Sequence, residues 1–185
     1  MQIEGGTGSG HKARVDADNR LHVFATSESE IHFASNEGLA FAWTAVNADL
    51  AALDTALLLC NDDPDRLLHI DRAYIFSDVP TAIKFHFPAY ATWAGTAITG
   101  KNFNRTSNKI ALASCYADET GNAFAAGNSF LTLQTNEVTT DQFGVMVDFQ
   151  NAVILGYHDS IAIDVVADSG AFEATLWGYF ENTDE

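Results

Sequence analysis

A glycine-rich segment at the start of the chain, GGTGSGHK, has the spacing of a phosphate-binding loop but not its chemistry. Gly5 and Gly10 stand at the Walker spacing. His11, however, occupies the position of the lysine, and Ala13 follows Lys12 where serine or threonine is needed. We expect no strand before this segment and no helix after it, so its backbone amides would not be aimed at a phosphate. The segment therefore does not predict a nucleotide site.

A second group of potential ligands follows an apolar run. Its four oxygen-bearing residues are Asn61, Asp62, Asp63 and Asp65. Carboxylate and amide oxygens are the ligands that calcium prefers, but the segment lacks the DxDxDG ladder and the distal glutamate of a calcium loop. Asn and Asp also favour tight turns, because their side chains bond to nearby backbone. We interpret the segment as a turn, with calcium binding as the alternative.

The histidines show no metal-binding spacing. They are His11, His22, His32, His69, His86 and His158, and no pair forms an HxH or HExxH pattern. His69 and Asp71 would share one face of a strand, but two ligands do not make a zinc site. We therefore expect exposed histidines on strands, and we predict neither a metal nor a cofactor.

No spacing of nucleophile, base and acid predicts catalysis. Ser160 follows His158 and Asp159, but neighbours along one strand cannot supply the geometry of a triad. Glu28 and Glu30 form a carboxylate pair in a polar connector without a cleft, so glycoside hydrolysis is not expected. The sequence predicts a protein that is not an enzyme.

The three tryptophans leave one binding function open. Trp43, Trp93 and Trp177 could line a sugar-binding face, although tryptophans of a β-sandwich are more often core or interface residues. A carbohydrate-binding module used for adsorption to a host is therefore an alternative prediction.

The charge of the chain limits its partners. The 185 residues can bury one core, and their formal net charge is −16. All nine Lys and Arg lie between Lys12 and Lys109, whereas the chain after Lys109 carries 12 Asp and Glu and no Lys or Arg. Such an acidic surface repels phosphate backbones and anionic lipid, so neither nucleic acid nor a membrane is an expected partner.

The cysteines and the apolar runs bear on location. Cys60 and Cys115 have no CxxC spacing, so we expect buried free thiols, with a disulfide as the alternative. No apolar run approaches the roughly 18 residues of a membrane span. The first ten residues have no signal-peptide core, so we expect synthesis in a cytoplasm.

Two alternating runs near the C-terminus organise the predicted fold. SIAIDVV (160–166) and AFEATLWGYF (171–180) both alternate apolar and other residues with the period of two that is typical of half-buried strands. Asp168, Ser169 and Gly170 provide a turn between them. We predict that the two runs form an antiparallel hairpin in one wall of a β-sandwich.

Turn signals elsewhere divide the chain into further strands. These are expected at residues 39–46, 55–60, 67–76, 81–87, 130–135 and 143–149. One slip in the alternation of residues 67–76 predicts a bulge, and residues 47–53 are ambiguous with a short helix capped by Asn47. Residues 88–127 are expected to form long loops with short strands near Ala97 and at 110–116; such a long irregular segment usually has a function of its own.

These elements predict an all-β fold. An antiparallel, jelly-roll-like β-sandwich would span residues 37–185, with its long loops at 88–127. Residues 1–36 would form an extended N-terminal arm that contains a short hairpin around the DADN turn. A polar connector, residues 27–38, would lie across another surface.

The N-terminal run IEGGTGSGHKARVDADNRLHVFATSESEIHFASNEGLAF, from Ile3 to Phe41, resembles the start of a family of tailed-bacteriophage virion proteins. That family opens with a similar IEGGTG, Lys-Ala-x-Val-Asp, Asn-Arg-Leu and Ser-Glu-Ser-Glu. Three later segments are also similar: TALLLCNDDPDRLLHIDRAYIF (55–76), GTAITGKNFNRTSNKIALA (95–113) and SIAIDVVADSGAFEATLWGYFE (160–181). These are packing and turn motifs rather than catalytic ones.

The resemblance implies a head decoration, or cement, protein that binds and stabilises the capsid lattice. Its implied partners are the major capsid protein and further copies of itself in a homotrimer, on the capsid surface of the virion after synthesis in the bacterial host. The implied interface residues are Ile3, Gly5, Gly6, His11, Arg14, Arg20, Glu28 and Glu30. A neck or tail component of the same particle is the alternative position.

Overall fold

The structure is a computed structural model that describes residues 2–4, 12–15, 21–22, 29–48, 50–52, 54–120, 129–134, 144–166 and 170–182. Residues 2–22 and 182 are described by their main chain alone.

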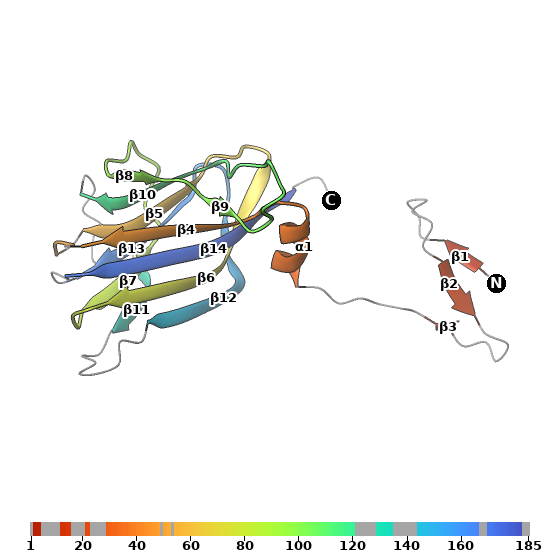
Figure 1. Cartoon of the computed structure of the whole chain (residues 1–185), viewed down its shortest axis with the longest axis horizontal. Coiled ribbons are helices and arrows are strands. Elements are labelled where there is room, and N and C mark those ends of the chain that lie inside the picture. Colours follow the sequence, from red (N-terminus) through yellow and green to blue (C-terminus); the bar gives the residue numbers. More distant parts are fainter. Residues whose placement is uncertain are drawn as a thin grey trace.

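Two antiparallel sheets pack face to face as a sandwich (Figure 1). The six-stranded sheet has the order β11 (Ser129–Gln134), β7 (Ala82–His86), β13 (Ser160–Val165), β5 (Thr55–Asn61), β10 (Ala113–Glu119), β8 (Thr96–Ile98). The five-stranded sheet has the order β12 (Val145–Leu155), β6 (Arg66–Ser77), β14 (Phe172–Asn182), β4 (Ala40–Asn47), β9 (Lys101–Asn102). The predicted all-β sandwich is confirmed.

The core lies between the two sheets. Leu57, Leu59 and Ile163 face it from the six-stranded sheet, and Phe41 and Trp43 face it from the other; none is more than 1% exposed. Alternate residues of a strand point to opposite faces, which is why the period of two in the sequence produces these buried rows. Burial of such side chains contributes about 1.5–3 kcal/mol each to stability.

The predicted C-terminal hairpin is wrong. Strand β13 pairs with β5 and β7, whereas β14 pairs with β4 and β6, so the two consecutive strands belong to opposite sheets. All six residues of β13 are buried, which places it in the middle of a covered sheet. Both runs are strands, as predicted, but β13 is buried on both faces rather than on one. An alternating pattern does not select the pairing partner of a strand.

The predicted slip in residues 67–76 is confirmed as a bulge in β6. In the pairing with β14, Trp177 lies opposite Arg72 and Gly178 lies opposite Ile70, so Asp71 is the extra residue. A Cβ atom on Gly178 would lie 2.5 Å from the carbonyl oxygen of His69, and this close approach explains the glycine.

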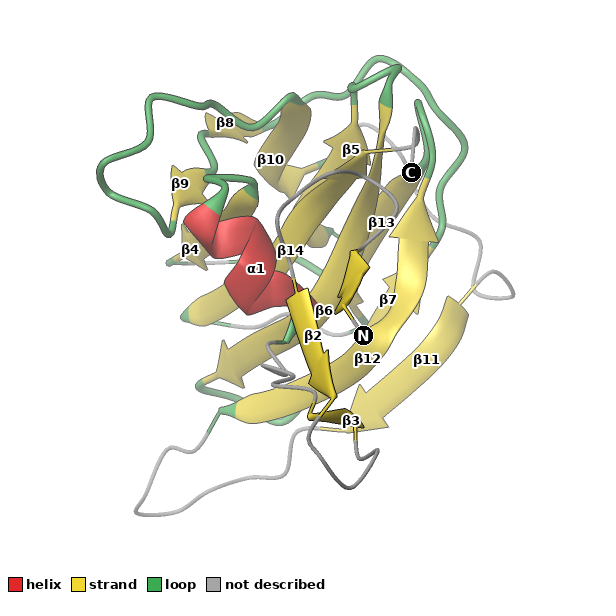
Figure 2. Ribbon diagram, turned by 90° about the vertical axis from the view of Figure 1, so that its right-hand side faces the viewer, coloured by secondary structure: helices red, strands yellow, loops and turns green. Residues whose placement is uncertain are grey.

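A short helix, α1 (Glu30–Asn36), replaces part of the predicted connector. The Oγ atom of Ser29 accepts a hydrogen bond from the backbone N–H of His32 (3.4 Å) at its start, and Gly38 (φ 71°) follows its end. Ala34 is buried in the core, and Figure 2 shows α1 against the end of the sandwich formed by β4 and β14. The connector thus lies across another surface, as predicted, but as a helix.

The short helix considered for residues 47–53 is not present in the described part of that segment. Asn47 closes β4, and its Nδ2 donates to the carbonyl oxygen of Ala56 (3.2 Å). Leu50 is fully buried in an isolated bridge. The polar side chain of Asn47 thus joins two strands instead of starting a helix.

The N-terminal residues form a separate small sheet. Strands β1 (Gln2–Glu4), β2 (Lys12–Val15) and β3 (Leu21–His22) are antiparallel in that order. The β2–β3 pair corresponds to the predicted hairpin, and Figure 1 draws the three strands to one side of the sandwich. The division of the chain at residue 36 stays a prediction.

Candidate functional site

Three of the eight predicted interface residues fall within the description. Ile3 lies in β1 opposite Ala13, and Arg14 lies in β2 opposite His22. Glu30 opens α1. The other five lie outside the described residues: Gly5, Gly6, His11, Arg20 and Glu28.

Glu30 fastens α1 to the sandwich. Its Oε2 atom accepts hydrogen bonds from Asn151 Nδ2 (2.7 Å) and from the hydroxyl of Tyr179 on β14. Burial, and then the hydrogen bond to Glu30, raise the pKa of Tyr179 well above its usual range, so the phenol stays a donor. The ring of Tyr179 stacks on the ring of His69, with ring centroids 4.9 Å apart. Glu30 therefore has partners within its own chain. Its role toward another subunit stays a prediction.

Removing the Tyr179 hydroxyl should weaken this attachment. We expect Tyr179→Phe to lower the free energy of unfolding by about 1–2 kcal/mol, because Glu30 loses one donor while the ring stacking is kept. Glu30→Gln and the double variant complete a thermodynamic cycle in urea denaturation. Effects of the two substitutions that simply add would show that the contact contributes no coupling energy.

The expectation of exposed histidines is wrong for two of them. His69 is 7% exposed and His86 only 1% exposed. His86 lies on the outward face of the six-stranded sheet, in a row with Ala162 and Leu58, which are also fully buried. The pattern of β7 correctly opposed His86 to the core-facing Phe85, but this outward face is covered rather than wet.

His86 forms a buried pair with Asp164, with His86 Nε2 3.4 Å from Asp164 Oδ2. Burial, and then Lys84, lower the pKa of His86. Burial raises the pKa of Asp164 to about 6, against the opposing effect of Lys84. Both shifts favour the uncharged forms, as expected for titratable groups removed from water.

In the described residues no group of three or more His, Cys, Asp or Glu is placed to hold a metal ion.

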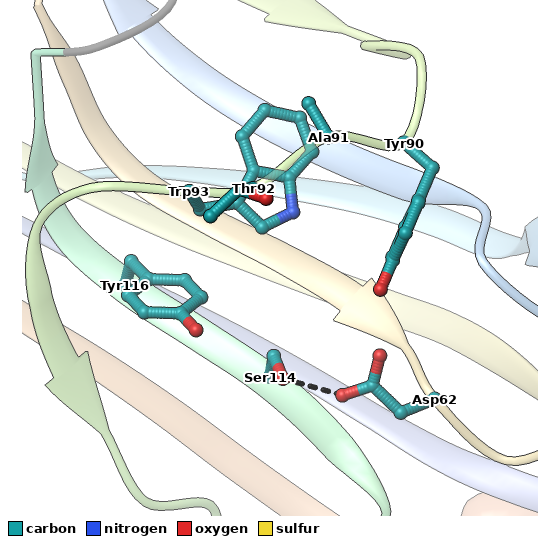
Figure 3. Close-up of a pocket in the computed structure, with 7 residues that line it drawn as sticks. All are labelled: Asp62, Tyr90, Ala91, Thr92, Trp93, Ser114 and Tyr116. Atoms are coloured by element: carbon teal, nitrogen blue, oxygen red, sulfur yellow. Dashed lines mark hydrogen bonds between the residues drawn. The ribbon is translucent and has the colours of Figure 1, made fainter.

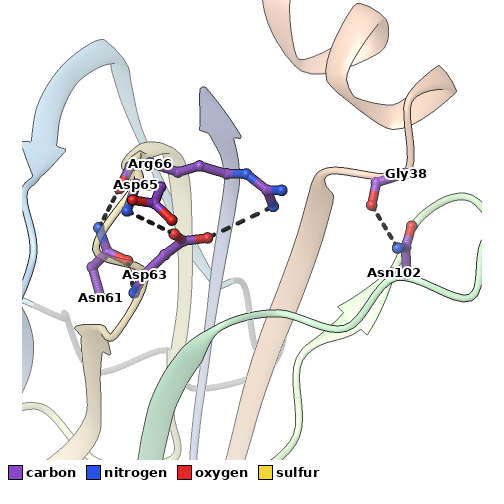
Figure 4. Close-up of polar contacts among 6 residues, drawn as sticks. All are labelled: Gly38, Asn61, Asp63, Asp65, Arg66 and Asn102. Atoms are coloured by element: carbon purple, nitrogen blue, oxygen red, sulfur yellow. Dashed lines mark hydrogen bonds and ion pairs between the residues drawn. The ribbon is translucent and has the colours of Figure 1, made fainter. Parts of the chain in front are cut away.

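The acidic turn after β5 is a ladder of turn hydrogen bonds (Figure 4). Asn61 Oδ1 accepts from the N–H of Asp63 (2.9 Å), and Asp63 Oδ1 accepts from the N–H of Asp65 (3.0 Å). Asn61 Nδ2 donates to the carbonyl oxygens of Arg66 and Leu155, both at 2.9 Å. These bonds account for the Asn and Asp spacing through turn chemistry, the interpretation favoured from sequence.

The same arrangement recurs after β9. Asn102 Oδ1 accepts from the N–H of Asn104 (2.8 Å), and Asn104 Oδ1 accepts from the N–H of Thr106 (3.1 Å). Asn102 Nδ2 donates to the carbonyl oxygens of Gly38 (2.9 Å) and Lys109 (3.1 Å). The contact with Gly38, drawn in Figure 4, joins this turn to the end of α1.

Residues 87–95 form a strap across the outward face of the six-stranded sheet. They leave β7 near one edge of that sheet and reach β8 at the opposite edge. The N–H of Ala94 donates to Glu119 Oε1 on β10 (3.1 Å). Gly95 has φ 146°, and a Cβ atom there would lie 2.7 Å from the carbonyl oxygen of Ala117, so the end of the strap lies close against β10.

A pocket of about 170 Å³ opens where the strap passes the end of β5. Its lining comes from the strap, from β10 and from the acidic turn, and consists of Asp62, Tyr90, Ala91, Thr92, Trp93, Ser114 and Tyr116. Figure 3 shows the tip oxygens of the two tyrosines and the carboxylate of Asp62 around one space.

Asp62 is held in place at the floor of the pocket. Its Oδ2 accepts a short hydrogen bond from the hydroxyl of Ser114, and its Oδ1 accepts from the thiol of Cys60 (3.6 Å). Burial raises the pKa of Cys60 to about 11, and Asp62 adds to this shift, so the thiol remains protonated. The prediction of buried free thiols is confirmed for both cysteines.

Aromatic rings form the walls and one rim. Tyr90 stacks on His158 with ring centroids 3.9 Å apart, and Tyr157 stacks on His158 at 3.7 Å. The indole Nε1 of Trp93 is buried and has no hydrogen-bond partner. Desolvation, and then the Asp62 carboxylate, raise the pKa of Tyr90, so it presents a neutral hydroxyl.

The three tryptophans do not share one surface. Trp43 is fully buried in the core, and Trp177 lies on the outward face of the five-stranded sheet, since its neighbour Leu176 faces the core. Trp93 alone of the three lines the pocket. Sequence analysis missed Tyr90, Ser114 and Tyr116; the available signal was the aromatic spacing YATW within a loop segment already expected to have a function.

The described residues include no helix long and apolar enough to cross a membrane.

The pocket combines a fixed carboxylate, hydroxyl groups and aromatic faces, which are suited to binding a small polar ligand. Comparison of the chain with protein-family models, with curated proteins and with solved structures finds no match to any of them.

Proposed function

We propose that this protein is a structural component of a tailed-bacteriophage virion, and specifically a head decoration protein that stabilises the capsid lattice. The observation that carries the proposal is the resemblance of residues 3–41 to the start of a family of such virion proteins. In this role the protein is not an enzyme, and its partners are the major capsid protein and two further copies of itself.

The positions of the resembling motifs support a structural role. Two of the similar segments, 55–76 and 95–113, contain the Asn61 and Asn102 turns, whose side chains bond to backbone and hold strands together. Motifs of this kind preserve a scaffold rather than a reaction centre. A scaffold with a separate N-terminal segment is the architecture expected of a subunit that binds its neighbours through an arm.

The charge distribution gives the arm a role in docking. Lys12 and Arg14 lie in β2, and Arg20 belongs to the same N-terminal segment, whereas the chain after Lys109 carries no Lys or Arg. An arm with these cations can contact acidic capsid surface while the acidic sandwich remains solvated. The attachment of α1 through Glu30 fixes where the arm leaves the sandwich.

Deleting residues 1–28 tests the proposal. The deletion keeps Ser29, the N-cap of α1, so the sandwich and its helix should remain folded. We expect the full-length protein to saturate phage heads that lack it and the truncated protein to lose at least 90% of this binding, measured by cosedimentation. Thermal unfolding of the truncated protein is the control for its folding, and unchanged occupancy of the heads would refute the role of the arm.

Cryo-electron microscopy of the particle distinguishes the decoration role from the neck or tail alternative. A decoration protein follows the capsid lattice over the whole head, whereas a neck or tail component occupies one vertex or the tail. Absence of the protein from assembled particles would refute both positions.

A further inference from the structure

We propose that the pocket beneath the strap is a binding site for a neutral saccharide, with room for one sugar ring. This inference stands apart from the virion role, because it rests on the side chains that line the pocket. The carboxylate at its floor is fixed by two donors, Ser114 and Cys60, and is therefore oriented before a ligand arrives.

The hydrogen-bonding groups of the pocket require a ligand that both donates and accepts. The carboxylate of Asp62 can only accept, and the indole N–H of Trp93 can only donate. The Trp93 donor is buried and has no partner, and Figure 3 shows its nitrogen on the side of the ring turned toward Tyr90 and Asp62. Neighbouring hydroxyl groups on a sugar ring satisfy both side chains at once.

Charge argues against an anionic ligand, and hydrogen bonding argues against a cationic one. An anionic ligand would be repelled by Asp62 and by a chain of net charge −16. An ammonium group would be attracted by the aromatic rings and by Asp62, but it has no acceptor for the N–H of Trp93. A neutral polyol is not repelled by Asp62, and its hydroxyl oxygens can accept a hydrogen bond from the N–H of Trp93.

The shape of the pocket sets the size of the ligand. Its volume of about 170 Å³ is well below the roughly 300–1,000 Å³ that hold drug-sized ligands, yet it is large enough for several water molecules. Trp93 and Tyr116 line the pocket with aromatic rings that can pack on the C–H groups of a sugar, while Tyr90, Ser114 and Asp62 provide polar groups. One ring of a longer glycan would therefore enter, and the rest would lie outside.

The test uses the full-length protein on an immobilised array of neutral mono- to tetrasaccharides. The glycans that bind are then titrated as methyl glycosides by ligand-observed NMR. We expect dissociation constants on the order of 1 mM for a single ring. Tetramethylammonium chloride and methyl glucuronide serve as the cationic and anionic comparison probes, and neither should compete.

Three variants connect binding to the pocket. Trp93→Ala and Asp62→Asn should each weaken binding at least about 10-fold, which corresponds to 1.4 kcal/mol. Trp93→Phe keeps a flat ring but lacks the N–H donor, and we expect it to weaken binding about 5-fold; it also serves as the test if Trp93→Ala does not fold. Trp177→Phe, the matched change on the opposite sheet, should leave binding unchanged.

The outcomes decide the proposal. Binding of a neutral glycan that is lost in the pocket variants and kept in Trp177→Phe supports it. The proposal is overturned if no neutral glycan on the array binds, if binding survives both Trp93→Phe and Asp62→Asn, or if tetramethylammonium binds in preference to every glycan.

Discussion

Replacing Asn61 by alanine should lower the free energy of unfolding by about 3–5 kcal/mol. The side chain is fully buried, and it donates to two carbonyl oxygens, of Arg66 and Leu155, while accepting from the N–H of Asp63. Alanine leaves these three groups without this partner in a site that is buried from solvent. An unsatisfied buried group costs about 1–3 kcal/mol, and three such groups near the lower end of this range give the expected loss.

Asn102→Ala is the matched control for this prediction. Asn102 also donates to two carbonyl oxygens and accepts from the N–H two residues ahead, but it is only half-buried. Water can replace some of the hydrogen bonds that the Asn102 side chain makes, so we expect the free energy of unfolding to fall by about 1–2 kcal/mol. The measurement is urea denaturation of both variants. Equal losses for Asn61 and Asn102 would show that burial does not set the cost.

Asp164→Asn should stabilise the protein by about 3 kcal/mol at pH 8, and the gain should shrink as the pH falls. Asp164 is 2% exposed, and burial raises its pKa from 3.8 to about 6. A raised carboxyl pKa means that the folded state holds a proton that the unfolded state has already lost. The wild-type protein therefore loses stability as pH rises from about 4 to about 6, and asparagine avoids this loss because it carries no charge.

Asp118→Asn is the control for the pH experiment. Asp118 is exposed, and its substitution also removes one negative charge from a chain of net charge −16. The difference between the two variants therefore isolates the buried site from the general relief of repulsion. Unfolding free energies measured from pH 4 to pH 8 should converge for Asp164→Asn and the wild type near pH 4. A gain that does not change with pH would refute the assignment of a raised pKa to Asp164.

The covered face of the six-stranded sheet holds a second titratable group beside Asp164. His86 faces Asp164 and carries a lowered pKa, so charging His86 below neutral pH is a separate cost to the folded state. Lys84, on the same strand as His86, favours the charged form of Asp164 and limits the size of its shift. Asparagine also removes the carboxylate that His86 faces, so the difference between the two proteins at each pH includes any change in the cost of charging His86.

Local patterns in the sequence were sufficient to predict most strands. Alternation along 67–76 predicted both β6 and its bulge, because an extra residue at Asp71 shifts every later side chain to the other face. The Asn61 turn was predicted from residue types that bond to their own backbone. The α1 helix was missed although Ser29 and Gly38 mark its ends, because its seven residues are too short for a clear helical period.

Long-range packing decided what the local patterns left open. Strands β13 and β14 read as a hairpin, but β13 is buried on both faces beside β5, and β14 pairs in the opposite sheet. The burial of His86 depends on a covered outward face, which no pattern within β7 contains. Local periodicity reports which residues share a face, whereas pairing and cover come from segments elsewhere in the chain.

The order of residue types along the chain was enough to predict an acidic β-sandwich with tight Asx turns and buried free thiols, and to reveal the resemblance to virion structural proteins. Which strands pair, which polar groups are buried and where a ligand can bind depend on contacts between distant segments. The pocket shows why: Asp62, Trp93 and Ser114 come from a turn, a strap and a strand that are distant along the chain. They meet because the strap crosses the sheet, and that crossing is a consequence of how the whole sandwich packs.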